Sequence, residues 1–146
     1  MASIKEYATF FREFRQRFET TGAIAPSSRF LARSMTRYLR ARKPDAGPVR
    51  VLEIGPGTGA VTRTIVRHLR EGDRFDLVEL NEAFADHLRH RFETDPAWKR
   101  VASLSEVHVA PLQEFQSDAP YDFVISGLPL NNFPAPLVDE IFEHYF

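Results

Sequence analysis

Apolar residues in the first forty positions recur at helical spacing. In residues 4–18 they stand three or four positions apart, which predicts an amphipathic helix. Its apolar side is formed by Ile4, Tyr7, Phe11, Phe14 and Phe18. The stretch TTGAIAPSS interrupts this pattern, and Ser27 or Ser28 can cap a second helix that runs to about Arg42. We therefore expect two helices before the first strand.

Short apolar runs alternate with amphipathic stretches in the rest of the chain. The runs predict strands at residues 49–54, 74–80, 106–110 and 121–126. The amphipathic stretches predict helices at residues 59–70, 82–93 and 135–146. This alternation predicts an α/β fold with a parallel sheet and right-handed crossovers.

The composition is that of a single globular domain. The 146 residues are 43% hydrophobic and 27% charged, and no apolar run approaches the roughly 18 residues of a membrane span. The N-terminal stretch is too charged and aromatic for a signal peptide. The chain has no cysteine, which excludes disulfides and thiolate metal sites within it and fits a cytoplasmic location.

Charge divides the chain into two parts. Residues 1–43 carry ten Lys and Arg against three Glu, whereas residues 44–146 carry nine against seventeen Asp and Glu. We interpret residues 1–43 as a basic helical segment and residues 44–146 as the α/β core. A basic segment favours an anionic partner, either nucleic acid or a lipid surface, and helices with solvated arginine faces are the alternative.

Three glycines within five positions follow the first predicted strand, in the stretch VLEIGPGTGAV. Gly55 and Gly57 can adopt backbone angles that a side chain forbids, and Gly59 lets the next helix start close to the strand. The spacing also fits the G-x-G-x-x-A form of a nicotinamide or flavin site. Ligands of such sheets bind beyond the carboxyl ends of the strands, so this loop is a candidate cofactor site.

Two carboxylates near the loop narrow the choice of ligand. Glu53 lies two residues before the first glycine, where it would repel a pyrophosphate but attract an ammonium group. Glu79 ends the second predicted strand, where a carboxylate can accept hydrogen bonds from both ribose hydroxyls of an adenosine. S-adenosylmethionine carries an adenosine and an ammonium group and has no phosphate, so it fits both carboxylates.

The stretch LEIGPGTG resembles the first motif of class I S-adenosylmethionine-dependent methyltransferases, acidic-x-G-x-G-x-G. The resemblance implies a Rossmann-like fold in which Glu53 serves the methionine end and Glu79 holds the ribose. It also implies that the cofactor is lined by Gly55, Gly57 and Gly59. Sheets of this class usually have seven strands, so the four predicted here imply a core that is shortened at the C-terminus. The resemblance implies the strand order 3-2-1-4, which leaves the fourth strand as an edge that favours self-association.

The predicted third strand ends differently from the family pattern. Many members carry an Asp there that contacts the adenine amino group, whereas this chain reads Ala110-Pro111-Leu112. The amide of Leu112 can still donate to the adenine ring, and Gln113 or Glu114 can take the place of the Asp. The alternative is that Pro111 only ends the strand.

The predicted fourth strand runs into SGLPLNNFP, the candidate acceptor site. Amino-methylating members carry a motif of the N/D/S-P-P-aromatic kind here. Gly127 and Leu130 replace the Asn and the aromatic residue of ribosomal-RNA adenine dimethyltransferases, which suits a small head group on an apolar substrate better than a flipped base. We expect Ser126 and the carbonyl of Leu128 to orient the acceptor amine. The candidate catalytic residues are Ser126, Gly127, Leu128 and Pro129.

From about residue 5 to residue 135 the chain resembles bacterial phospholipid N-methyltransferases, which methylate phosphatidylethanolamine. The resemblance implies an enzyme that is peripherally bound to an anionic membrane through residues 4–18. The alternative for these residues is that their aromatic side packs on the protein's own sheet. An RNA adenine methyltransferase and an inactive cofactor-binding fragment are the alternatives, and nucleic acid is the less favoured partner. We expect no metal site, because His87 and His90 lie one helical turn apart without a third ligand.

Overall fold

A computed structural model describes residues 28–126, 135–136, 138–139 and 143. The predicted helix at residues 4–18 and most of the predicted C-terminal helix lie outside the described residues. The same holds for residues 127–130 of the stretch SGLPL.

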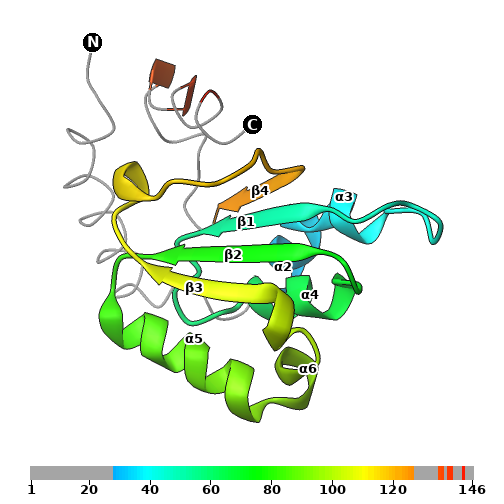
Figure 1. Ribbon diagram of the computed structural model, residues 1–146, viewed down its shortest axis with the longest axis horizontal. Coiled ribbons are helices and arrows are strands. Elements are labelled where there is room, and N and C mark those ends of the chain that lie inside the picture. Colours follow the sequence, from blue (N-terminus) through cyan, green and yellow to red (C-terminus); the bar gives the residue numbers. More distant parts are fainter. Residues whose placement is uncertain (1–27, 127–134, 137, 140–142, 144–146) are drawn as a thin grey trace.

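The described strands form one parallel sheet (Figure 1). Its strands are β1 (Arg50–Ile54), β2 (Arg74–Glu79), β3 (Ser105–Val109) and β4 (Phe123–Ser126). Their order in the sheet is β3-β2-β1-β4, which confirms the predicted α/β class and strand order. Within the described part of the chain β4 is an edge strand, and self-association through it stays a prediction.

Helical crossovers connect the strands, as the periodicity predicts. They comprise α4 (Thr62–His68), α5 (Glu82–Thr94), α6 (Pro96–Lys99) and the 3-10 helices η2 (Ala102–Leu104) and η3 (Leu112–Glu114). Side-chain caps start two of them, because Asn81 accepts from the Phe84 N–H and Asp95 accepts from the Ala97 N–H. A helix of the length and apolarity needed to cross a membrane does not occur among the described residues.

The second predicted helix is divided into α2 (Ser28–Met35) and α3 (Arg37–Arg40). At Thr36 the backbone N–H donates to the Ala32 carbonyl at 3.1 Å, and the hydroxyl donates to the same oxygen at 2.7 Å. A hydroxyl that bonds back to the carbonyl four residues earlier bends a helix, which the spacing of apolar residues does not reveal. Beyond the bend, Leu39 is buried in the core.

The core lies between the sheet and the crossover helices. It is formed by one face of each strand, with Val51, Phe75, Leu77, Val107 and Ile125, and by Ile65, Val66, Leu88, Phe92 and Trp98 of the helices. Each large apolar side chain buried in this way stabilises the fold by roughly 1.5–3 kcal/mol. The sheet is therefore rigidly backed where the glycine loop leaves β1.

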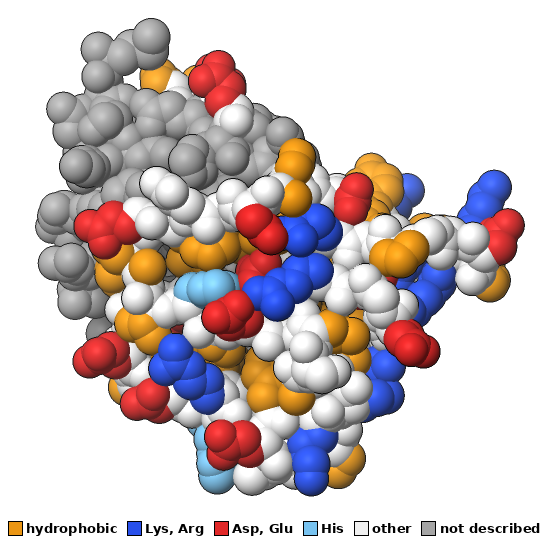
Figure 2. All heavy atoms as spheres, in the orientation of Figure 1, with side chains coloured by type: hydrophobic (Ala, Val, Ile, Leu, Met, Phe, Trp, Pro, Cys, Tyr) orange, Lys and Arg blue, Asp and Glu red, His pale blue; other side chains and the backbone are white. Residues whose placement is uncertain are grey.

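The opposite face of the sheet carries a polar network around Asp76. This carboxylate is 3% exposed and accepts from the Arg74 guanidinium at 2.7 Å and the Tyr121 hydroxyl at 2.8 Å. Its Oδ1 also lies 2.8 Å from Nε2 of His108, and Arg74 pairs with Glu106 at 2.6 Å. Burial alone would raise the pKa of Asp76, but the bonds from Arg74, His108 and Tyr121 outweigh it and lower the pKa. Figure 2 shows charged and His side chains gathered over the strands on this face.

A buried ion pair joins the segment before β1 to the turn before β2. Asp73 accepts from both terminal nitrogens of Arg42, at 2.9 and 2.8 Å, and from the backbone N–H groups of Val49 and Arg70. The two side chains are only 4% and 1% exposed. Burial raises the pKa of Asp73, but the bonds from Arg42, Val49 and Arg70 outweigh this effect and lower it.

We expect Asp73→Asn to lower the free energy of unfolding by about 3 kcal/mol at neutral pH, because the charge of Arg42 is left buried without its partner. The folded-state pKa of Asp73 lies below its unfolded value of about 3.9, so its contribution is present above that value. The contribution is lost as the pH falls through the folded pKa. Urea unfolding of both proteins at neutral pH and at about pH 3 should therefore show a smaller difference in acid.

Asp118→Asn is the matched control for this change. Asp118 pairs with Arg50 at 2.7 Å, but its side chain is 88% exposed, so we expect a loss below about 0.5 kcal/mol. Equal losses in the two variants at neutral pH would contradict a stabilising role for the buried pair.

Candidate functional site

The glycine-rich loop leaves the carboxyl end of β1 in a backbone shape that needs glycine. Gly55, Gly57 and Gly59 have φ angles of 63°, 60° and 88°, which side-chain-bearing residues rarely adopt. The Gly55 N–H donates to the Val78 carbonyl at 2.9 Å, and the Gly59 N–H donates to the Pro56 carbonyl at 3.0 Å. The loop is thus attached to β2, and the permissive angles predicted for Gly55 and Gly57 are confirmed.

Glu79 stands at the end of β2, in contact with the loop. Its side chain is fully buried, and Oε1 accepts from the Gly57 N–H at 2.9 Å. Oε2 accepts from the N–H of Asn81, the N-cap of α5, also at 2.9 Å. A carboxylate oxygen can accept more than one hydrogen bond, so these contacts orient the group and are compatible with a further donor. Gly57 and Glu79, which the sequence analysis assigned to the same cofactor site, are therefore in direct contact.

Glu53 lies in β1 on the face that packs against α4. Its carboxylate is fully buried and accepts from the hydroxyl of Thr62, which contacts Oε1 and lies 3.0 Å from Oε2. Thr62 is itself fully buried and is the first residue of α4. The sequence analysis missed Thr62, because only the packing of α4 on β1 brings the two side chains together.

Trp98 of α6 supports the loop from the core side. A Cβ atom added to Gly59 would lie 2.9 Å from Cη2 of Trp98 and 3.1 Å from Cδ2 of Leu88. The indole is fully buried, contacts the Phe92 ring edge-on at 4.9 Å, and has the Arg91 guanidinium 4.2 Å from its centroid. We expected Gly59 to permit close packing of the next helix on its strand, whereas the close neighbours are side chains of α5 and α6.

Leu112 and Ser126 are the other predicted site residues that the structure describes. Leu112 begins η3 and is 8% exposed, and the preceding strand end is attached to β2 through a bond from the Ala110 N–H to the Glu79 carbonyl at 3.2 Å. Ser126 ends β4, is 8% exposed and pairs in register with Ile54, the last residue of β1. The remaining candidates, Gly127, Leu128 and Pro129, lie outside the described residues and stay predictions.

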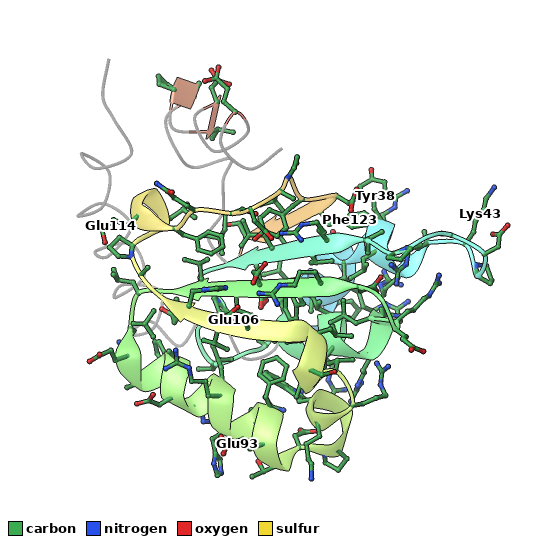
Figure 3. The ribbon with its side chains drawn as sticks, viewed as in Figure 1. Tyr38, Lys43, Glu93, Glu106, Glu114 and Phe123 are labelled. Atoms are coloured by element: carbon green, nitrogen blue, oxygen red, sulfur yellow. The ribbon has the colours of Figure 1, made fainter. Side chains whose placement is uncertain are left out.

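The carboxyl ends of the parallel strands meet at one edge of the sheet (Figure 1). The glycine loop, Glu79, η3 and Ser126 therefore share this edge, and Figure 3 shows Glu114 of η3 there. The edge combines a glycine-rich backbone with two buried carboxyl groups, those of Glu53 and Glu79. This arrangement can hold a ligand that carries hydroxyl donors and a cationic group.

A possible set of metal ligands lies away from this edge. Carboxylate oxygens of Asp76 and Glu106 and a ring nitrogen of His108 lie within 4.8 Å of one another. The Arg74 guanidinium bonds to both carboxylates, at 2.7 and 2.6 Å, and supplies the positive charge that a metal would bring. We therefore interpret this cluster as an ion-pair network. His87 and His90 are both exposed on α5, as expected for a solvated helix face.

Comparison with known sequences identifies related methyltransferases. The family model for protein-L-isoaspartate(D-aspartate) O-methyltransferase (PCMT) matches residues 11–143. An ornithine lipid N-methyltransferase of Singulisphaera acidiphila is 30% identical over 144 residues, which cover 96% of this chain and 70% of that protein. An rRNA methyltransferase of Streptomyces thermotolerans is 35% identical over 106 residues, which cover 73% of this chain and 31% of that protein.

Solved structures show the same Rossmann-like fold. A methyltransferase from Thiobacillus denitrificans in complex with S-adenosyl-L-homocysteine has a TM-score of 0.56 at 18% identity, covering 77% of this chain and 44% of that one. The O-methyltransferase TomG from Streptomyces achromogenes in complex with SAM has a TM-score of 0.51 at 27% identity, covering 83% and 49%. The chain thus spans less than half of either solved structure.

We expect Gly59→Ala to lower the free energy of unfolding by about 2–4 kcal/mol, because the new Cβ meets Trp98 and the positive φ becomes strained. Thermal or urea unfolding measures the loss. Gly47→Ala is the matched control, since a Cβ there meets nothing within 4 Å and its φ is not positive. A loss for Gly59→Ala no larger than that for Gly47→Ala would show that the contact with Trp98 is not restrictive.

Proposed function

The chain belongs to the class I S-adenosylmethionine-dependent methyltransferases, and on that premise we propose that it methylates the amine of a membrane lipid of the phosphatidylethanolamine type. The observation that carries this proposal is the likeness to an ornithine lipid N-methyltransferase over 96% of the chain. Phosphatidylethanolamine and ornithine lipids both present a primary amine close to an anionic group and acyl chains. Both substrates therefore require a site that accepts a primary amine close to an anionic group and acyl chains.

S-adenosylmethionine is the cofactor of this class, and the described residues fit it. Glycines at positions 55, 57 and 59 leave the loop backbone open to close approach. The Glu79 carboxylate, oriented by Gly57 and Asn81, is proposed to accept hydrogen bonds from the ribose hydroxyls. Glu53 supplies negative charge for the ammonium group at the methionine end. When bound, the cofactor supplies a methyl group on a positively charged sulfur.

The protein's task in this reaction is positioning. A neutral primary amine is already a nucleophile, so the chain must hold it in line with the methyl group and exclude water. Ser126 ends β4 beside the last residue of β1, and its hydroxyl is proposed to accept a hydrogen bond from the amine. The carbonyl of Leu128 is proposed as the second acceptor. In this proposal the amine's proton leaves to water or to the lipid's own phosphate.

Residues 4–18 are proposed to dock on an anionic membrane. Their Phe and Tyr side chains can enter the head-group layer while four basic residues remain at its surface. Each basic residue near an anionic leaflet contributes roughly 1 kcal/mol, so binding would be reversible. This docking would bring the acceptor segment to its lipid in a peripherally bound, cytoplasmic enzyme.

RNA methylation is the second candidate, favoured by the rRNA methyltransferase that is 35% identical over 73% of the chain. Gly127 and Leu130 oppose it, because a flipped base needs a polar group and a stacking partner at those positions. A cofactor-binding fragment without activity is the third candidate. Methyl-transfer assays with lipid vesicles and with rRNA distinguish it from the other two.

The first prediction from the proposed function concerns the cofactor. We expect S-adenosylhomocysteine to bind with a dissociation constant on the order of 1 μM. Glu79→Ala should weaken this binding by about 1–3 kcal/mol, because it removes a charge-assisted contact to the ribose and the bond to Gly57. Calorimetry measures both affinities, and Glu82→Ala, an exposed residue three positions away, should leave the affinity unchanged. Unchanged binding by Glu79→Ala, or tighter binding of NAD, would contradict the assignment.

The second prediction concerns the acceptor. Labelled methyl groups from S-adenosylmethionine should enter vesicles that contain phosphatidylethanolamine and anionic lipid, and the same vesicles should carry the chain in flotation. Ser126→Ala should lower kcat by roughly tenfold, because one orienting hydrogen bond to the amine is lost. Phosphatidylcholine replaces phosphatidylethanolamine in the control, since its nitrogen is already fully methylated. Transfer to rRNA and not to lipid would favour the second candidate, and transfer to neither would favour the third.

A further inference from the structure

The Thr62 hydroxyl makes a contact that differs from those of Thr36 and Thr94. Thr36 and Thr94 donate to the carbonyl four residues earlier, at 2.7 and 2.8 Å. Thr62 instead donates to the carboxylate of Glu53, reaching both of its oxygens. The N-terminus of α4 has Val61 as its N-cap and no side-chain cap bond. The hydroxyl is therefore directed at the carboxylate rather than at the helix backbone.

The contact is made where water has no access. Glu53 and Thr62 are both 0% exposed. A carboxylate taken out of water is costly unless donors compensate it, and a hydroxyl that donates to it stabilises the ionised form. Charge buried in this way is also screened less than charge at a surface, so it acts on a cation several ångströms away. Such a charge can attract a cation at the glycine loop without touching it.

We propose that Thr62 is a positioning residue for the ammonium group of the cofactor, acting through Glu53. The Thr62 hydroxyl holds the carboxylate in one orientation at the carboxyl end of β1, next to the loop. The inference rests on the proposed function, because it needs a ligand with an amino-acid ammonium at this edge. Through this contact α4 would contribute to the recognition of the ammonium group, a role that neither the glycine motif nor Glu79 fills.

A merely structural role for Thr62 predicts a different behaviour. If the hydroxyl only anchors α4 to β1, its removal loosens the loop and weakens every ligand of the loop equally. If it acts through Glu53, its removal weakens ligands that carry the ammonium group and spares those that lack it. The two roles are therefore separated by comparing two ligands with the same adenosine.

The test compares S-adenosylhomocysteine with 5′-methylthioadenosine, which shares the adenosine and the thioether but lacks the amino-acid part. Calorimetry on the full chain measures both affinities for the wild type, Thr62→Val and Thr62→Ser. We expect Thr62→Val to weaken S-adenosylhomocysteine about tenfold, the effect of one hydrogen bond to a charged group. The same variant should change the affinity for 5′-methylthioadenosine by less than about twofold, and Thr62→Ser should restore the wild-type pattern.

Glu53→Gln provides an independent second measurement. It should weaken S-adenosylhomocysteine selectively, and adding Thr62→Val to it should cause no further selective loss, since Thr62 acts through the charge that is already gone. Thermal unfolding without ligand confirms that each variant is folded. If Thr62→Val does not fold, Thr62→Ala replaces it, because the smaller side chain fits the same space.

Three results would overturn the proposal: equal losses for both ligands, unchanged affinity for S-adenosylhomocysteine in Thr62→Val, or additive selective losses in the double variant. Each of these leaves the cofactor assignment intact, because the wild type still binds S-adenosylhomocysteine. Failure of the wild type to bind either ligand would instead overturn the proposed function, and this inference with it.

Discussion

Two carboxylates buried at the carboxyl ends of neighbouring strands govern the arrangement of the candidate site. Buried charge must be compensated by hydrogen-bond donors, and each carboxylate obtains them from an element that the site needs in place. Glu79 takes them from the Gly57 N–H and the Asn81 N–H, which joins the glycine loop and the start of α5 to β2. Glu53 takes one from Thr62, which joins α4 to β1. The groups proposed to hold the cofactor also hold the glycine loop in shape.

The two faces of the sheet contribute to this site in different ways. The apolar face packs against the helices and places the Trp98 indole directly behind Gly59, so the loop has no room for a side chain there. The opposite face carries Asp76, whose bonds from His108 and Tyr121 join β2 to β3 and to the segment that precedes β4. Packing on one face thus restrains the glycine loop, and the polar network on the other face holds neighbouring segments of the sheet together.

Membership of a large methyltransferase class defines the cofactor but not the methyl acceptor. The cofactor half of the site is formed by β1, β2 and the helices that follow them, and solved methyltransferases share this architecture. The acceptor half is proposed to lie at the end of β4, where Ser126 pairs in register with Ile54, the last residue of β1. A lipid methyltransferase and an rRNA methyltransferase both match the chain, so class membership alone leaves the methyl acceptor open.

The sequence by itself determined the α/β class and the glycine loop, because these follow from local periodicity and backbone sterics, and its resemblance to class I methyltransferases supplied the strand order. It also placed Glu79 beside the loop, since parallel strands end at a common edge. Only the tertiary structure joined Thr62 to Glu53, Trp98 to Gly59 and Arg42 to Asp73. These pairs come from different elements, and no local pattern encodes which side chains meet when helices pack on a sheet. The depth of burial, and with it the strength of each charge, is likewise a property of that packing.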